Sequence, residues 1–268
     1  MAMDNVYEAS ASNSKPEPGD DNLSARLDQE QEDTPPPPRA VRALSQTQER
    51  NLMDYLEARF LDVTRNFKKR ADPSSTLRTL PAYLEATHHL LSLILQIPPV
   101  DPSAPLRTAL LLRLTGDVLS AVPGYGPALE PTALPLLLSW LADLDAAWLA
   151  VLRAQAWDPA RERAVDALPD LPEGEGARAS RPSQTERTRL RSLLIGGTDA
   201  LEEWVEKVTV GMDVAGELEG AGAEVSLGHA QGRAEIEQAF NELFAGTLAE
   251  MGSLTGAMND PRGMEATC

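Results

Sequence analysis

Cysteine is nearly absent from this chain, because the single cysteine is the last residue, Cys268. One thiol cannot form an internal disulfide, so a disulfide-stabilised secreted fold is excluded. The composition fits a reducing compartment instead. We therefore expect an intracellular protein, located in the nucleus or the cytoplasm.

Histidine is also scarce, with three residues in the chain, and the common motifs of catalysis are missing. The sequence contains no GxxxxGK[ST] phosphate loop, no GxGxxG, no HExxH, no CxxC and no GxSxG. His88 and His89 are adjacent, so on a helix they point about 100° apart and do not share one metal ion. The sequence therefore predicts no catalytic residue, no metal site and no cofactor.

Asp143 and Asp145 form an acidic pair that interrupts an apolar segment. A spacing of two places them on roughly opposite faces of a helix, which argues against a shared acid/base site. We expect one of them to face solvent and the other to meet an arginine, with Arg113, Arg153 and Arg161 as candidates.

Aromatic residues make up only 4% of the chain, whereas leucine and alanine dominate it. This composition favours helices packed through leucine over a β-sheet. Two helix starts carry the capping-box pattern, in which a serine precedes a glutamine or glutamate by three residues: Ser45 to Gln48 and Ser183 to Glu186. The fold class predicted is all-α.

Apolar periodicity predicts about six helices and no strand pattern of any strength. The first helix shows the pattern most clearly, with apolar residues at steps of four, four, three and four from Leu52 to Phe67. Gly196 and Gly197 lie inside the fifth helix, where we expect a kink. The expected helices are 46–70, 81–97, a segment from the Asp101-Pro102 pair to about 122, 132–156, 184–209 and 228–251.

These helices group into a leucine-rich bundle with extra segments. Residues 1–42 read as a disordered acidic and proline-rich tail, because they have too few large apolar residues to form a core. Residues 43–157 hold the core of four helices, and 158–182 read as a flexible linker. Residues 183–252 supply two further helices, which either pack on the core or form a separate hairpin. Residues 253–268 read as a frayed tail.

The formal net charge is −17, and it is spread unevenly. Residues 1–38 carry nine acids against two bases, and residues 199–268 carry fourteen against three, whereas residues 39–80 carry nine bases against five acids. An acidic chain is repelled by nucleic acid and by anionic lipid, so we expect neither as a direct partner. The longest apolar stretch, 133–152, contains two aspartates and reads as a buried helix, not a membrane span. The expected partners are proteins, with a basic protein as the easier match.

Two groups of residues are candidates for partner binding. The first is the positive end of the first helix, where the alternative is a solvated helix end. The second is the apolar face of the last helix, where the alternative is packing onto the chain's own bundle. The candidate residues are Arg65, Lys68, Lys69, Arg70, Ile236, Phe240, Leu243, Phe244 and Leu248.

The leading functional hypothesis is a non-enzymatic helical interaction protein that acts as an adaptor or subunit of a larger intracellular assembly. The alternative is an acidic chaperone or escort of a basic client protein, such as a histone or a ribosomal protein. An enzyme with a site built from scattered residues, His88, Asp143 and Asp145, is the third hypothesis. The sequence leaves the oligomeric state open.

Overall fold

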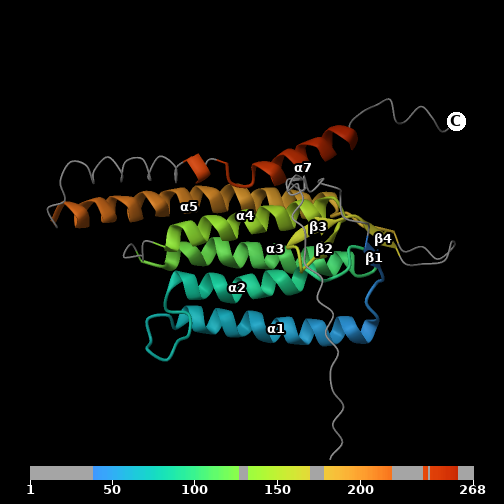
Figure 1. The fold of residues 1–268 in the computed structure, drawn as a ribbon, viewed down its shortest axis with the longest axis horizontal. Helices are drawn as coiled ribbons and strands as arrows, with labels where there is room; N and C mark the ends of the chain where they lie inside the picture. The colour runs from blue at the N-terminus through green and yellow to red at the C-terminus, as the bar shows by residue number, and fades with distance from the viewer. Residues whose placement is uncertain (1–38, 127–131, 170–177, 219–237, 241, 259–268) are drawn as a thin grey trace, which may run out of the picture. The chain divides into compact units, whose positions relative to one another are not determined.

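The computed structural model describes residues 39–126, 132–169, 178–218, 238–240 and 242–258 (Figure 1). The prediction of an all-α helical bundle is confirmed. In chain order the elements are β1 (Arg39–Val41), α1 (Gln46–Lys68), α2 (Leu80–Leu95), α3 (Ala104–Ala121), a 3-10 turn η1 (Val122–Gly124), α4 (Ala133–Leu152), β2 (Ala156–Asp158), β3 (Arg163–Val165), β4 (Ala167–Pro169), α5 (Gln184–Leu218) and α7 (Ala245–Met258).

Both predicted capping boxes are present. At the start of α1, Ser45 Oγ accepts from the Gln48 backbone N–H at 3.3 Å, and Gln48 Oε1 accepts from the Ser45 backbone N–H at 2.9 Å. At the start of α5, the same reciprocal bonds join Ser183 and Glu186, at 3.3 and 2.7 Å. Each box satisfies backbone donors that a helix leaves free at its first turn.

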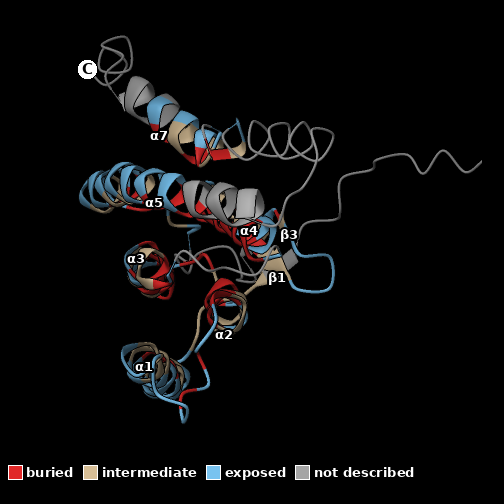
Figure 2. Cartoon of the chain, turned by 90° about the vertical axis from the view of Figure 1, so that its left-hand side faces the viewer, coloured by how far each residue is buried: buried red, intermediate tan, exposed pale blue. Residues whose placement is uncertain are grey.

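The core lies between the helices. Helix α1 packs on α2, α2 packs on both α3 and α4, α3 packs on α5, and α4 packs on α7. The buried residues, red in Figure 2, gather on the faces that these helices turn toward one another. Among the described helices, α4 alone is long and apolar enough to cross a membrane, with a mean hydropathy of 1.5. In this fold its side chains Leu137, Leu141 and Leu144 lie fully buried in the bundle.

Short strands occupy parts of the chain that the sequence assigned to the tail and the linker. Strand β1 pairs in parallel with β4, and β2 pairs antiparallel with β3. Strand β1 therefore lies at the end of the predicted tail, residues 1–42. The predicted linker 158–182 contains β3, β4 and the last residue of β2. Three-residue strands are too short to show an alternating pattern, which explains why periodicity missed them. Residues 1–38 and 170–177 lie outside the described residues.

The last two helices also differ from their predicted bounds. Helix α5 continues through Gly196 and Gly197 and reaches Leu218, nine residues beyond its predicted end. A single helix over 228–251 is wrong: the chain is helical at 238–240, turns at 242–244, and α7 then runs to Met258. Phe244 has a φ of 57°, a left-handed conformation that ends a right-handed helix.

Candidate interaction groove

Helices α2 and α4 border an open groove of about 510 Å³, which we call the α2–α4 groove. Its lining residues recur at helical spacing on each side, so one face of each helix forms one wall. Leu136 stands out, because a large aliphatic side chain is 48% exposed there. The lining residues are Pro81, Ala82, Leu84, Glu85 and His88 from α2 and Leu136, Ser139, Trp140 and Asp143 from α4.

Trp140 carries a buried donor that has no acceptor. Its side chain is 3% exposed, and its indole N–H has no hydrogen-bond partner in the described part of the chain. Two other buried tryptophans differ: Trp148 donates to Thr115 Oγ1 at 3.0 Å, and Trp204 donates to the Tyr125 carbonyl at 2.9 Å. An unpaired buried polar group calls for an explanation, since most such groups are bonded.

The rim of the groove is acidic. His88 Nε2 lies 3.3 Å from Asp143 Oδ2, and both side chains are about half exposed. Burial raises the pKa of the Asp143 carboxyl, the nearby His88 lowers it, and Glu162, between β2 and β3, raises it again. Glu85 adds a second carboxyl to the groove lining. The groove therefore combines an apolar floor with a negatively charged edge.

The acidic pair divides between two surfaces, as its spacing predicted. Asp143 faces His88, whereas Asp145 Oδ1 accepts from the backbone N–H of Thr247 at 3.0 Å and so caps the first turn of α7. The expected arginine partner is wrong: among the described residues, neither aspartate forms an ion pair with an arginine. Asp143 pairs with His88 instead, and Asp145 accepts a hydrogen bond from the backbone at the start of α7. The two carboxyls form no shared acid/base site.

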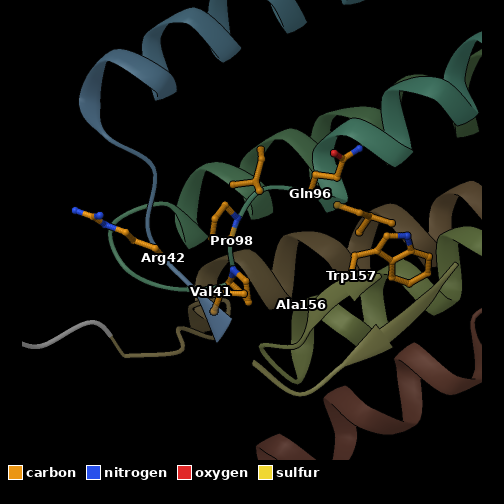
Figure 3. A pocket seen from close by; sticks show the side chains of 9 residues that line it. Val41, Arg42, Gln96, Pro98, Ala156 and Trp157 are labelled. Carbon is orange, nitrogen blue, oxygen red and sulfur yellow. The ribbon is translucent and has the colours of Figure 1, made fainter. Parts of the chain in front are cut away.

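A second, smaller cavity of about 220 Å³ lies where β1, the end of α2 and β2 meet (Figure 3). Val41, Pro98 and Trp157 are among its lining residues. Arg42 is part of the lining, but Figure 3 shows its side chain extending away from the other sticks. This volume lies below the 300–1,000 Å³ that ligand sites usually have, so the cavity suits no more than one side chain of a partner.

The predicted basic cluster at the end of α1 is divided. Arg65, Lys68 and Lys69 are exposed, whereas Arg70 is turned inward. Arg70 Nε donates to the Gly124 carbonyl at 3.0 Å, and its guanidinium lies 4.4 Å from the Phe67 ring centre. Arg70 therefore fastens the η1 turn to α1. Only the other three side chains remain available to a partner.

The predicted apolar face of the last helix is used inside the chain. Phe240 and Phe244 are buried, with 4% and 1% exposure, and Leu243 and Leu248 pack partly buried against the same core. Ile236 lies outside the described residues. Packing on the chain's own bundle, the alternative stated above, accounts for this face. Helix α7 packs on α4, so the described residues of this face contribute to the core of the bundle.

Two further contacts hold α7 on α4. Arg153 pairs with Glu250 at 2.8 Å, which adds to the bond between Asp145 and Thr247. A Cβ atom at Gly246 would lie 2.8 Å from Asp145 Oδ2, so the glycine permits the aspartate to approach the helix start closely. Among the described residues, the groove beside α2 holds three exposed side chains of α4, namely Leu136, Ser139 and Asp143.

Sequence reasoning missed the α2–α4 groove, although a signal for it was present. The fourth predicted helix carries leucine or tryptophan on most of its sides, more than one core-facing stripe requires. Leu136 is the surplus apolar residue: it is 48% exposed, one turn before the buried Trp140. Its partner wall on α2 could not be identified from the sequence, because periodicity does not say which helices are neighbours.

The described residues contain no group of three or more histidine, cysteine, aspartate or glutamate side chains arranged to hold a metal ion. The comparisons with known proteins supply no further assignment: no family model, no curated protein and no solved structure matches this chain.

Proposed function

We propose that this chain is a non-enzymatic helical interaction protein, an adaptor or subunit of a larger intracellular assembly, and that the α2–α4 groove is its partner-binding surface. The observation that carries the proposal is Leu136, a half-exposed leucine beside the buried Trp140 in an open groove. The fully buried centre of a protein interface is more apolar than its rim, so an exposed leucine in a groove suits such a centre.

The groove is suited to binding because its walls are already ordered. Leu84 on one wall and Trp140 on the other are buried in the core, so little side-chain freedom is lost when a partner binds. Covering the exposed half of Leu136 contributes about 1 kcal/mol, half of what full burial of a leucine supplies. Several such contacts are needed for a stable complex.

The test compares two leucines that are equally exposed. Leu136 is 48% exposed in the groove, and Leu61, on α1, is 46% exposed. Tagged protein carrying Leu136→Glu is purified from its native cells next to wild type and Leu61→Glu, and the bound proteins are identified by mass spectrometry. We expect partners to be lost with Leu136→Glu and retained with Leu61→Glu. The same partners with all three proteins would reject the groove as the binding surface.

The net charge of −17 favours one second candidate, an acidic escort of a basic client. The same purification at high salt separates the two functions. Near 0.5 M salt the Debye length falls to roughly 4–5 Å, so a complex held mainly by charge dissociates. A complex held by an apolar groove persists, because burial of apolar surface does not weaken with salt.

A further inference from the structure

Helix α5 turns one side toward the bundle and leaves the other exposed. Leu190, Leu194 and Leu201 are buried on the inner side, and Figure 2 shows pale blue along the outer side. Ile195 is an exception there, because a large apolar side chain is 47% exposed. Exposed residues recur around it at steps of three or four, so they share one face of the helix. We call this the outer face of α5: Thr188, Arg191, Ile195, Asp199, Glu202 and Glu206.

The charge along α5 changes sign at Ile195. The eleven residues before it, 184–194, hold three bases and one acid, and the eleven residues after it, 196–206, hold four acids and no base. On the outer face, Arg191 lies four residues before Ile195, and Asp199 lies four residues after it. The outer face is therefore basic on one side of Ile195 and acidic on the other.

These charges do not stabilise α5 itself. Side chains four residues apart are neighbours on a helix, and like charges at that spacing repel. Three pairs on α5 are of this kind: Arg187 and Arg191, Asp199 and Glu203, and Glu202 and Glu206. Among the described residues, Arg191, Asp199 and Glu202 form no ion pair. A second molecule can supply the opposite charges that the described part of this chain does not.

The outer face is complementary to itself when a second copy of α5 runs in the opposite direction. In a symmetric dimer the same patch of both copies meets, so each contact occurs twice. With the two-fold axis at Ile195, the two Ile195 side chains meet at the centre. Arg191 of each copy then lies opposite Asp199 of the other, because both are four residues from the axis. Thr188 lies opposite Glu202 for the same reason, so its hydroxyl can donate to a carboxylate.

We propose that this chain forms a symmetric homodimer in which the outer face of α5 packs antiparallel on that of a second copy. The net charge of −17 on each copy opposes association. At physiological ionic strength the Debye length is about 8 Å, so the charges close to the interface decide the outcome. One helix from each copy makes a small interface, and we expect a dissociation constant on the order of 10 μM. This inference goes beyond the proposed function, because α5 supplies no residue to the α2–α4 groove.

Sedimentation velocity of the full chain at about 1 to 200 μM measures the dimer directly. We expect wild type to pass from monomer to dimer over this range. Ile195→Glu should weaken dimerisation at least about tenfold, because it places two carboxylates at the axis. Leu61→Glu is the matched control, since Leu61 is 46% exposed and lies on α1. Wild type that stays monomeric at the highest concentration would overturn the proposal, and so would equal weakening by the two variants.

A charge exchange between two variants tests the register. Arg191→Glu and Asp199→Arg each place like charges opposite one another twice in the dimer, so each variant alone should dimerise at least about tenfold more weakly. Mixed together, the two variants should form a heterodimer, because each position 191 then meets an opposite charge at position 199. Arg50→Glu makes the same change at an exposed residue of α1 and should dimerise like wild type. A mixture that associates no better than its components would refute the pairing of Arg191 with Asp199.

Distances between spin labels test the direction of the two helices. In a Cys268→Ser background, the label is attached at Ser192→Cys or at Gln184→Cys, both exposed positions of α5. At 1.5 Å per residue, two antiparallel copies separate the labelled positions along the helix axis by about 9 Å at 192 and about 33 Å at 184. Short distances at both positions would mean a parallel pair and would contradict the proposed arrangement.

Discussion

A buried arginine stands out among the individual residues. Arg107 on α3 is 1% exposed, and its Nη1 donates to the Gln155 carbonyl at 2.7 Å. Its Nε and Nη2 have no partner within the described residues. Burial lowers the pKa of Arg107 to about 10, so the side chain is still charged at neutral pH. Within the described part of the bundle, no carboxylate forms an ion pair with this buried cation, so its burial costs free energy.

Replacing this arginine by a neutral side chain of similar length should stabilise the protein. We expect Arg107→Met to raise the free energy of unfolding by about 1–3 kcal/mol, because it removes a buried charge and two unpaired donors. Urea denaturation followed by circular dichroism measures the change. Lys207→Met is the control: Lys207 pairs with Glu203 at the surface, so its loss should cost only about 0–1 kcal/mol. A destabilised Arg107→Met variant would show that the cation has a stabilising role.

Two tyrosines should make the protein sensitive to alkali. Tyr83 and Tyr125 lie with Phe67 in an aromatic cluster whose ring centres are 5.6–5.7 Å apart. Burial raises the pKa of Tyr125 from 10.0 to about 12, with Arg70 opposing the shift. Burial also raises the pKa of Tyr83, and the charge of Asp117 adds to it. Both tyrosines are therefore held in their neutral form.

The sign of the effect follows from these raised values. Between pH 10 and about 12 the folded protein binds more protons than the unfolded chain, so stability is full below pH 10 and is lost as pH rises through this range. We expect the urea midpoint to fall over this range and to fall less in Tyr125→Phe. Tyr55, 43% exposed, supplies the control variant Tyr55→Phe. A midpoint that falls equally in wild type and Tyr125→Phe would exclude Tyr125 as the cause.

At the scale of elements, two adjacent glycines of α5 have different roles. A Cβ atom at Gly197 would lie 2.5 Å from Leu119 Cδ1 on α3, whereas a Cβ at Gly196 would meet nothing within 4 Å. Of the two glycines, Gly197 is therefore the one that permits close packing of α5 on α3. The sequence suggested a kink because glycine weakens helices generally, and it could not show which glycine faces another helix.

This pair gives a matched test. Gly197→Ala should destabilise the protein by about 1–3 kcal/mol, because the added methyl group overpacks the contact with Leu119. Gly196→Ala should stabilise it by about 0.5–1 kcal/mol through better helix propensity. Thermal unfolding of the two variants measures both changes. Equal effects would mean that α5 does not approach α3 at Gly197.

The helices were predictable where residues close together in the sequence determine that a helix forms. The capping boxes at Ser45 and Ser183 and the apolar steps of α1 are local signals, and the helices begin where they predict. The break before α7 was not predictable, since it depends on burial of Phe244 in the bundle and on a cap from Asp145. The α2–α4 groove was not predictable either. It exists only when α2 lies beside α4, and periodicity does not say which helices are neighbours.

At the scale of the whole molecule, charge dominates. A net charge of −17 produces self-repulsion that weakens the folded state, and the surface ion pairs offset little of it. We expect the melting temperature to rise by a few degrees between about 10 and 150 mM NaCl, as the Debye length falls from about 30 to 8 Å. Differential scanning calorimetry measures this rise. Sucrose at the same osmolality is the control. It carries no charge and does not screen charges, so it should not produce the same rise in melting temperature. A melting temperature that does not change with salt would mean that the excess acids are too far apart to repel one another.

The cap that Asp145 provides for α7 has a consequence for the order of folding. The two residues joined, Asp145 and Thr247, are 102 positions apart in the chain. Helix α7 gains the stabilisation of this cap only after α4 has formed and the start of α7 lies beside Asp145. We therefore expect the earlier helices to associate before α7 packs on α4, both in refolding and during synthesis on the ribosome.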